Sequence, residues 1–218
     1  PEFENAFTKW HKSESIKATP WKTLRPTAMK SNLPKLEVMD DNSIYSSGDV
    51  TKRDVFDLNF TSDQTITALR LEVLTDDRLP GQGPGRCYYE GRKGTFFLSE
   101  VDLKKSNGSK VKFAKPTATS GNGADKVIDD VGSSGWSSGI GQDHHLILPL
   151  ADPLPANTPF SIELLFERHF VASLGRFRIS ATSSTNQPRV SKIGVEAEHI
   201  LSLKDTAKPQ DLSALRSI

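Results

Sequence analysis

The chain has 218 residues, and its 28 basic and 27 acidic residues leave a formal net charge of +1. This balance gives no support for nucleic acid or an anionic membrane as partner, and no apolar run approaches the ~20 residues that span a bilayer. Cys87 is the only cysteine, which excludes an internal disulfide and a CxxCH haem attachment. The sequence starts at Pro1 without a signal-peptide pattern, so we expect a piece of a longer protein.

The first sixty residues predict a lead-in followed by strands. Residues 1–20 carry Phe3, Phe7 and Trp10 at the spacing of one helical face. Residues 21–34 are rich in proline and predict an extended edge segment. Short strands are expected at residues 36–39 and 44–48, and alternation predicts a longer strand at residues 54–60.

The longest uninterrupted feature is an insert between two alternating runs. Residues 66–74 and 97–103 alternate apolar and polar side chains, which predicts two half-buried strands. The insert, residues 76–94, holds five glycines, two prolines and three arginines, together with Tyr88 and Tyr89. A loop of this length is usually functional; the alternative is an ordered loop that covers one end of the domain.

The second half predicts more strands and then helices. Asn107 and Gly108 stand between two alternating runs, which is a strong hairpin signal. Further strands are expected at residues 145–150, where Pro149 and Pro153 should stop the strand, and at residues 160–166 and 174–182. Helical spacing begins near Ile193.

These elements, with no alternation of strands and helices, predict an all-β fold. We expect an antiparallel β-sandwich or jelly roll with a short C-terminal helical extension. The expected division is a lead-in at residues 1–20, a β-sandwich binding domain at residues 21–188, and a helical linker at residues 189–218 that leads to a following domain.

Three motifs carry a resemblance to a known family. ITALRLEVL…LPGQGPGR…FFLSEVDL, VIDDVGSSGWSSG and HFVASLGRFRISAT occur in that order. They resemble a domain of large planctomycete secreted proteins that also carry a cytochrome-type domain and two uncharacterised planctomycete domains. The resemblance covers residues from Trp21 to the C-terminus and implies a periplasmic or extracellular location. The haem motif is absent from the sequence, so electron transfer is not implied.

The second half also resembles the discoidin, galactose-binding-like jelly-roll pattern. In that pattern an aspartate turn precedes a tryptophan, as Asp129 and Asp130 precede Trp136, and a late basic strand closes the sandwich. The resemblance implies sugar binding through loops at one end, with a structural Ca²⁺ at Asp129 and Asp130. The turn is Asp-Asp where the pattern usually has Asp-Gly.

Sugar recognition combines aromatic stacking with charged or amide hydrogen bonds. For Trp136 the alternative to stacking on a sugar is a structural role, as a core side chain that closes the sandwich. For Arg176 the alternative to ligand binding is a place on a solvated sheet face, where it would pair with Glu163 or Glu167. The candidate ligand-binding residues are Arg86, Tyr88, Tyr89, Trp136, His144 and Arg176.

Catalytic motifs are absent from the sequence: there is no GxSxG elbow, P-loop or HExxH. We therefore expect no enzyme, but a noncatalytic carbohydrate-binding module of a large exported protein. Its ligand would be a polysaccharide, including sulfated or uronic-acid types. The alternative is a structural domain that docks against neighbouring domains of the same polypeptide.

Overall fold

The computed structural model describes residues 2–86, 90–191 and 193–217. The chain divides into two compact units: Thr23–Val190 form a β unit, and the segments before and after it form a helical unit. Among the described residues, no helix has the length and apolar character needed to cross a membrane.

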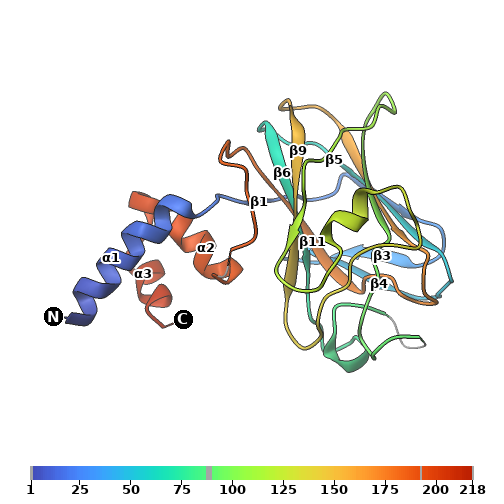
Figure 1. Cartoon of the computed structure of the whole chain (residues 1–218), viewed down its shortest axis with the longest axis horizontal. Coiled ribbons are helices and arrows are strands. Elements are labelled where there is room, and N and C mark those ends of the chain that lie inside the picture. Colours follow the sequence, from blue (N-terminus) through green and yellow to red (C-terminus); the bar gives the residue numbers. More distant parts are fainter. Residues whose placement is uncertain (1, 87–89, 192, 218) are drawn as a thin grey trace. The chain divides into compact units, whose positions relative to one another are not determined.

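Two antiparallel sheets build the β unit (Figure 1). In the first sheet β1 (Lys22–Thr23) pairs with β11, and the remaining strands lie in the order β3 (Lys35–Val38), β4 (Ile44–Ser47), β11 (Arg176–Thr182), β6 (Ile66–Val73), β9 (His144–Leu154) and β8 (Thr117–Ala118). In the second sheet the order is β2 (Ala28–Ser31), β5 (Asp54–Phe60), β10 (Phe160–Phe166) and β7 (Glu100–Lys105). The predicted antiparallel β-sandwich is therefore confirmed.

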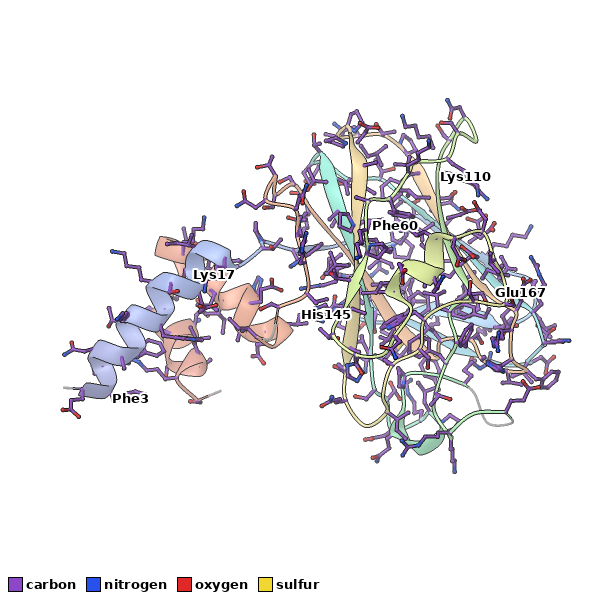
Figure 2. The ribbon with its side chains drawn as sticks, viewed as in Figure 1. Phe3, Lys17, Phe60, Lys110, His145 and Glu167 are labelled. Atoms are coloured by element: carbon purple, nitrogen blue, oxygen red, sulfur yellow. The ribbon has the colours of Figure 1, made fainter. Side chains whose placement is uncertain are left out.

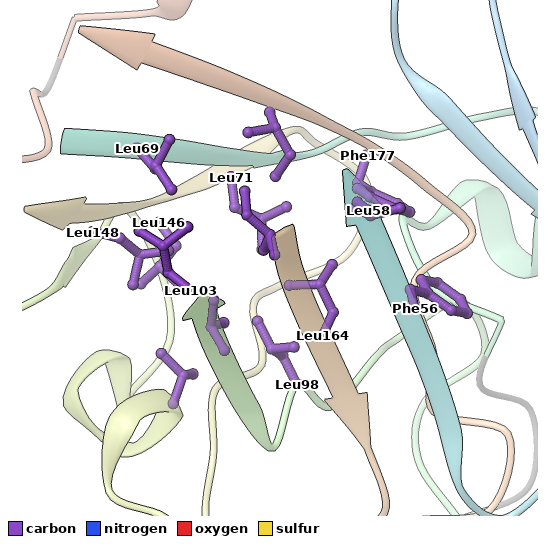
Figure 3. Close-up of a cluster of buried hydrophobic side chains, with 14 of the residues drawn as sticks. Phe56, Leu58, Leu69, Leu71, Leu98, Leu103, Leu146, Leu148, Leu164 and Phe177 are labelled. Atoms are coloured by element: carbon purple, nitrogen blue, oxygen red, sulfur yellow. The ribbon is translucent and has the colours of Figure 1, made fainter. Parts of the chain in front are cut away.

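The core lies between the sheets because the strands alternate. In β5 the side chains of Phe56, Leu58 and Phe60 are buried, while the residues between them are partly exposed. Figure 3 shows leucines and phenylalanines of both sheets, such as Leu71 and Leu164, pointing into one shared cluster. Burying side chains of this kind contributes about 1.5–3 kcal/mol each, so the period-2 pattern dictates which faces meet.

Strand β9 differs from its prediction. It continues through Pro149 and Pro153 to Leu154 rather than stopping at the prolines. Proline lacks only the N–H, and the carbonyl of Pro149 still accepts a hydrogen bond from the Ala114 N–H at 2.8 Å. The register of β6 against β9 also shifts between Ile66 and Ala68. Strand β9 therefore continues past its prolines because Ala114, from another segment, bonds to Pro149 and because the pairing with β6 changes register.

The hairpin predicted at Asn107 and Gly108 is confirmed. Lys104 and Lys110 face each other in an antiparallel bridge, and the Val111 N–H donates to the Leu103 carbonyl at 2.8 Å. Gly108 has φ of 82°, in the left-handed region that glycine adopts without strain. Two short 3₁₀ helices, η1 (Pro80–Gln82) and η2 (Ala124–Ile128), lie in the loops that follow β6 and β8.

The described residues of the helical unit form α1 (Glu2–Lys17), α2 (Val195–Ser202) and α3 (Pro209–Leu215), with a 3₁₀ turn, η3 (Lys204–Thr206), between the last two. Pro209 occupies the first turn of α3, where a helix tolerates proline. The buried cluster of this unit consists of Ala197, Ile200, Leu201 and Leu215, with Phe7 of α1 packed against it. Segments from both sides of the β unit therefore share one small core.

Candidate functional site

The β unit has two different ends. At the insert end, β6 finishes, β7, β9 and β11 begin, and residues 76–94 form the long insert. At the hairpin end, β5 and β7 finish and β10 begins, as the pairing of Phe160 with Phe60 and Lys105 shows. In Figure 1 the described residues of the insert lie at the bottom of the β unit, and the turn that joins β7 to the residues after it lies at the top.

The loops at the insert end interlock through their backbones. The N–H of Leu98 donates to the Trp136 carbonyl at 2.9 Å, and the N–H of Trp136 returns a bond of 2.8 Å. A Cβ atom on Gly85 would lie 2.0 Å from the Thr95 carbonyl oxygen. Such close backbone approach requires glycine, so the glycine content of the insert has a packing reason.

Trp136 is fully buried at this end. Its ring meets Phe96 edge-on with centroids 5.0 Å apart, and its Nε1 donates to the Ser120 carbonyl at 2.8 Å. A ring with no exposed face cannot stack on a sugar, so the geometry fits the core alternative for this residue.

Arg86 anchors the insert to the loop after β4. Its guanidinium donates to the Ser46 hydroxyl at 3.3 Å, to the Asp49 carbonyl at 3.2 Å and to the Gly48 carbonyl. Burial lowers the pKa of Arg86, and the charge of Asp54 opposes that shift. Asp54 itself is 1% exposed, its carboxylate oxygens have no hydrogen-bond partner within the described residues, and burial raises its pKa.

Arg176 lies on the outward face of the first sheet within a set of ion pairs. Its guanidinium contacts Asp41 at 2.8 Å and Asp76 at 3.4 Å. The neighbouring Arg178 pairs with the buried Glu72 at 2.8 Å. The alternative prediction, in which Arg176 lies on a solvated sheet face and pairs with Glu163 or Glu167, named the wrong partners. Glu163 belongs to the second sheet, whereas Arg176 belongs to the first. Asp41, in the turn between β3 and β4, and Asp76, in the loop after β6, pair with Arg176 instead.

His144 is also buried. Its Nδ1 lies 3.5 Å from the Thr119 hydroxyl, its Nε2 has no hydrogen-bond partner among the described residues, and burial lowers its pKa. Tyr88 and Tyr89 lie outside the described residues. Among the described residues, the side chains of Arg86, Trp136, His144 and Arg176 share no hydrogen-bond partner. A common ligand position for them stays a prediction.

The two proposed calcium ligands have other partners. Asp129 accepts from the Ser134 hydroxyl at 2.8 Å and from the Val131 N–H at 3.1 Å, while the exposed Asp130 lies 3.2 Å from the Lys110 ammonium. Within the described ranges, no three His, Cys, Asp or Glu residues form a metal-ligating group. Calcium binding at Asp129 and Asp130 stays a prediction.

Glu100 and Asp129 form a pair of neighbouring carboxyl groups at the insert end. The Val131 N–H also donates to Glu100 Oε1 at 2.7 Å. Burial, together with the hydrogen bond and charge of Asp129, raises the pKa of Glu100 to about 7. Hydrogen bonds from Ser134 and Val131 lower the pKa of Asp129 although burial opposes them. The carboxylate of Asp129 therefore favours the protonated form of Glu100.

The hairpin end carries an open hollow with a volume of about 460 Å³. Its aromatic members are Phe60, labelled in Figure 2, and Phe160, whose rings stack at 5.7 Å. Both are buried, so neither offers a free face. The hollow is lined by Thr27, Asn59, Phe60, Thr61, Lys104, Lys105, Ser106, Gly108, Pro159, Phe160 and Ser161.

Three polar side chains cross the hollow in one row. Ser161 on β10 pairs in register with Asn59 on β5 and with Lys104 on β7. Residues opposite one another on neighbouring strands have their Cβ atoms about 5 Å apart on the same face. The side chains of an asparagine, a serine and a lysine therefore start side by side on one face of the paired strands.

Sequence reasoning missed this hollow. Its polar residues are ordinary types, and they lie far apart in the chain. The one available signal was the Asn-Gly turn, which places the end of β7. Strand register, which local patterns do not supply, brings Asn59, Ser161 and Lys104 together.

No family model and no curated protein matches the chain. The catalytic domain of a GH87 alpha-1,3-glucanase in complex with nigerose is similar in structure at a TM-score of 0.36 and 12% identity, over 88% of this chain and 35% of that one. The chain thus spans about a third of the length of that glucanase domain.

A family 3a carbohydrate-binding module from a scaffolding protein of Clostridium thermocellum is similar at a TM-score of 0.25 and 12% identity. That match covers 76% of this chain and 88% of the module. Similarity this low does not define a function.

Proposed function

We propose that the β unit is a noncatalytic carbohydrate-binding domain and that it binds its polysaccharide in the hollow at the hairpin end. The observation that carries the proposal is the row formed by Asn59, Ser161 and Lys104. Sugar hydroxyls both donate and accept hydrogen bonds. The amide of Asn59 and the hydroxyl of Ser161 do the same, while Lys104 donates.

The size and rigidity of the hollow support the same ligand class. Its volume of about 460 Å³ falls within the roughly 300–1,000 Å³ of pockets that hold small ligands. The polar row stands on β5, β10 and β7, which are paired along their whole lengths. Groups presented by paired strands are held in place before the ligand arrives, which reduces the entropy lost on binding.

A binding role fits the lining better than hydrolysis does. Glycoside hydrolysis uses two carboxyl groups on either side of the scissile bond. Among the described residues that line the hollow, none is an aspartate or a glutamate. We propose binding within a larger exported protein, in the periplasm or outside the cell, as the resemblance of the three sequence motifs implies.

The test is a binding screen followed by matched variants. The protein would be screened against a glycan array, and the best ligand titrated calorimetrically. Asn59→Ala removes the amide from the row, whereas Asn122→Ala removes one from an exposed loop. We expect Asn59→Ala to weaken binding roughly ten- to a hundredfold, which corresponds to about 1–3 kcal/mol, and Asn122→Ala to leave it unchanged. Equal affinity of the two variants, or no glycan bound at all, contradicts the proposal.

Exposed apolar side chains favour a second candidate, docking against a neighbouring domain. Val50, Val131 and Phe170 are 41%, 47% and 37% exposed in loops of the insert end. The loops of Val50 and Phe170 are linked by a bond from the Val171 N–H to the Thr51 carbonyl. Apolar surface of this kind suits a protein partner. Replacing Val131 and Phe170 by serine would weaken such docking and leave saccharide binding intact.

A further inference from the structure

The charges around the hollow point to the class of saccharide. Lys104 and Lys105 both line it, and the described lining contains no acidic residue. We infer that the bound saccharide carries an anionic group, a carboxylate or a sulfate, and that this group pairs with Lys105 and Lys104. The inference rests on the proposed function, because it assigns the ligand of that same hollow.

Lys105 is the more available of the two cations. Its side chain is exposed and has no carboxylate within ion-pairing distance in the described chain. Its backbone is fixed, because the Lys105 N–H donates to the Ser109 carbonyl at 2.9 Å and its carbonyl accepts from the Gly108 N–H at 2.8 Å. The hairpin thus holds an uncompensated ammonium group at the rim of the hollow.

Lys104 is held in place but retains donors. Its Nζ lies 3.5 Å from both Asp102 and Glu163, whereas charge-assisted hydrogen bonds are about 2.7–2.9 Å long. Lys110 contacts Asp102 more closely, at 2.9 Å, and so supplies most of the compensation for that carboxylate. An ammonium group with three donors and two long contacts can accept an anionic ligand without losing a short bond.

An acidic row next to the hollow fixes the direction of the ligand. One register step along the sheet, Glu163 faces Asp57 on one side and Asp102 on the other. These carboxylates repel an anion, so the anionic group must sit on the hairpin side, against the lysines. The uncharged hydroxyls then fall on Asn59 and Ser161. A single acidic sugar is therefore preferred over a chain that carries an anion on every residue along the strands.

The experiment compares short galacto-oligosaccharides of equal length in three forms: neutral, ending in one galacturonate, and carrying one sulfate. Calorimetric titration at low and high salt measures each affinity. We expect one or both acidic forms to bind at least about tenfold more tightly than the neutral form at low salt, and the difference to shrink as salt screens the charges. The two acidic arms separate a carboxylate-specific from a sulfate-specific hollow.

Matched lysine variants complete the test. Lys105→Gln should remove most of the preference for the acidic forms. Lys104→Gln should lower the preference and also weaken the neutral form, because Lys104 belongs to the polar row, while Lys35→Gln on β3 of the other sheet should change neither. Equal binding of neutral and acidic forms overturns the inference and leaves the proposed function standing. A preference that falls equally in Lys35→Gln shows nonspecific charge attraction and also overturns it. If no form binds and the glycan array also yields no ligand, both the inference and the proposed function are overturned.

Discussion

The two ends of the β unit use their residues in opposite ways. The insert end is rich in glycine, arginine and aromatic residues, yet its described members largely bind one another: Trp136 is buried, and Arg86 holds backbone carbonyls. The hairpin end consists of ordinary polar residues, yet Asn59, Ser161 and Lys105 line an open hollow. Residue types that signal recognition in a sequence can therefore serve packing, while the hollow that we propose for ligand binding is lined by residues that carry no such signal.

The reason for the difference lies in loop length. A long insert must satisfy its own backbone and charged groups where it crosses the end of the sandwich, and its polar side chains are the nearest partners. The turn at Asn107 and Gly108 is short and needs none of the neighbouring strand side chains. The row on the outward face of β5, β10 and β7 stays open to a ligand.

The largest expected effect is that of Trp136→Ala. Removing a buried tryptophan leaves a cavity beside Phe96, so we expect the free energy of unfolding to fall by about 3–5 kcal/mol. Chemical denaturation measures the loss. Trp136→Phe should lose less, because it keeps an aromatic ring against Phe96 and gives up the hydrogen bond to Ser120. A stable Trp136→Ala variant with impaired saccharide binding would mean that the insert end recognises the ligand.

Local patterns predicted the strands well where each strand pairs regularly. β5 and β10 alternate strictly, and their ends match residues 54–60 and 160–166 as predicted. The length of β9 depended on Ala114, which bonds to Pro149 from another segment. A local pattern contains no information about such a partner.

The candidate site shows the same limit more strongly. Serines and glycines surround Trp136 in the sequence, and its burial comes from Phe96 and Leu98, some forty residues earlier in the numbering. Arg176 finds Asp41 and Asp76 across the chain. Burial and pairing over such separations follow from the packing of the whole sandwich, which residue type alone does not determine.

The next effect in size is that of Arg86→Ala. The variant leaves the Ser46 hydroxyl and the carbonyls of Gly48 and Asp49 without their donor, so we expect a loss of about 1–3 kcal/mol in the free energy of unfolding. Arg92→Ala is the matched control, because Arg92 is an exposed arginine in the same insert. Saccharide affinity should be unchanged in both. Equal stability of the two variants would show that Arg86 is no anchor, and weaker binding by a fully stable Arg86→Ala would return the insert to the binding site.

The smallest effect concerns the carboxyl pair at the insert end. Because the pKa of Glu100 is raised to about 7 from 4.5, the folded protein holds a proton that the unfolded chain releases more readily. This contribution to stability is fully present below pH 4.5 and is lost as the pH rises through 7. Glu100→Gln keeps a neutral side chain and should remove that pH dependence. We expect the difference in unfolding free energy between wild type and variant to change by about 1 kcal/mol between pH 4.5 and 8, since solvent screens a partly exposed carboxyl.

A difference curve is needed because other groups titrate in the same range. Burial and the charge of Arg70 lower the pKa of His145 to about 4, and this histidine affects wild type and variant alike. Glu37→Gln, at an exposed position of β3, is the matched control and should give a flat difference. If Glu100→Gln is equally flat, the carboxylate of Asp129 does not favour the protonated form of Glu100. A curve of the opposite sign would mean that Glu100 is ionised in the folded protein. The Val131 N–H would then stabilise the carboxylate together with a cation. Repeating the measurement with added calcium would test for that cation first.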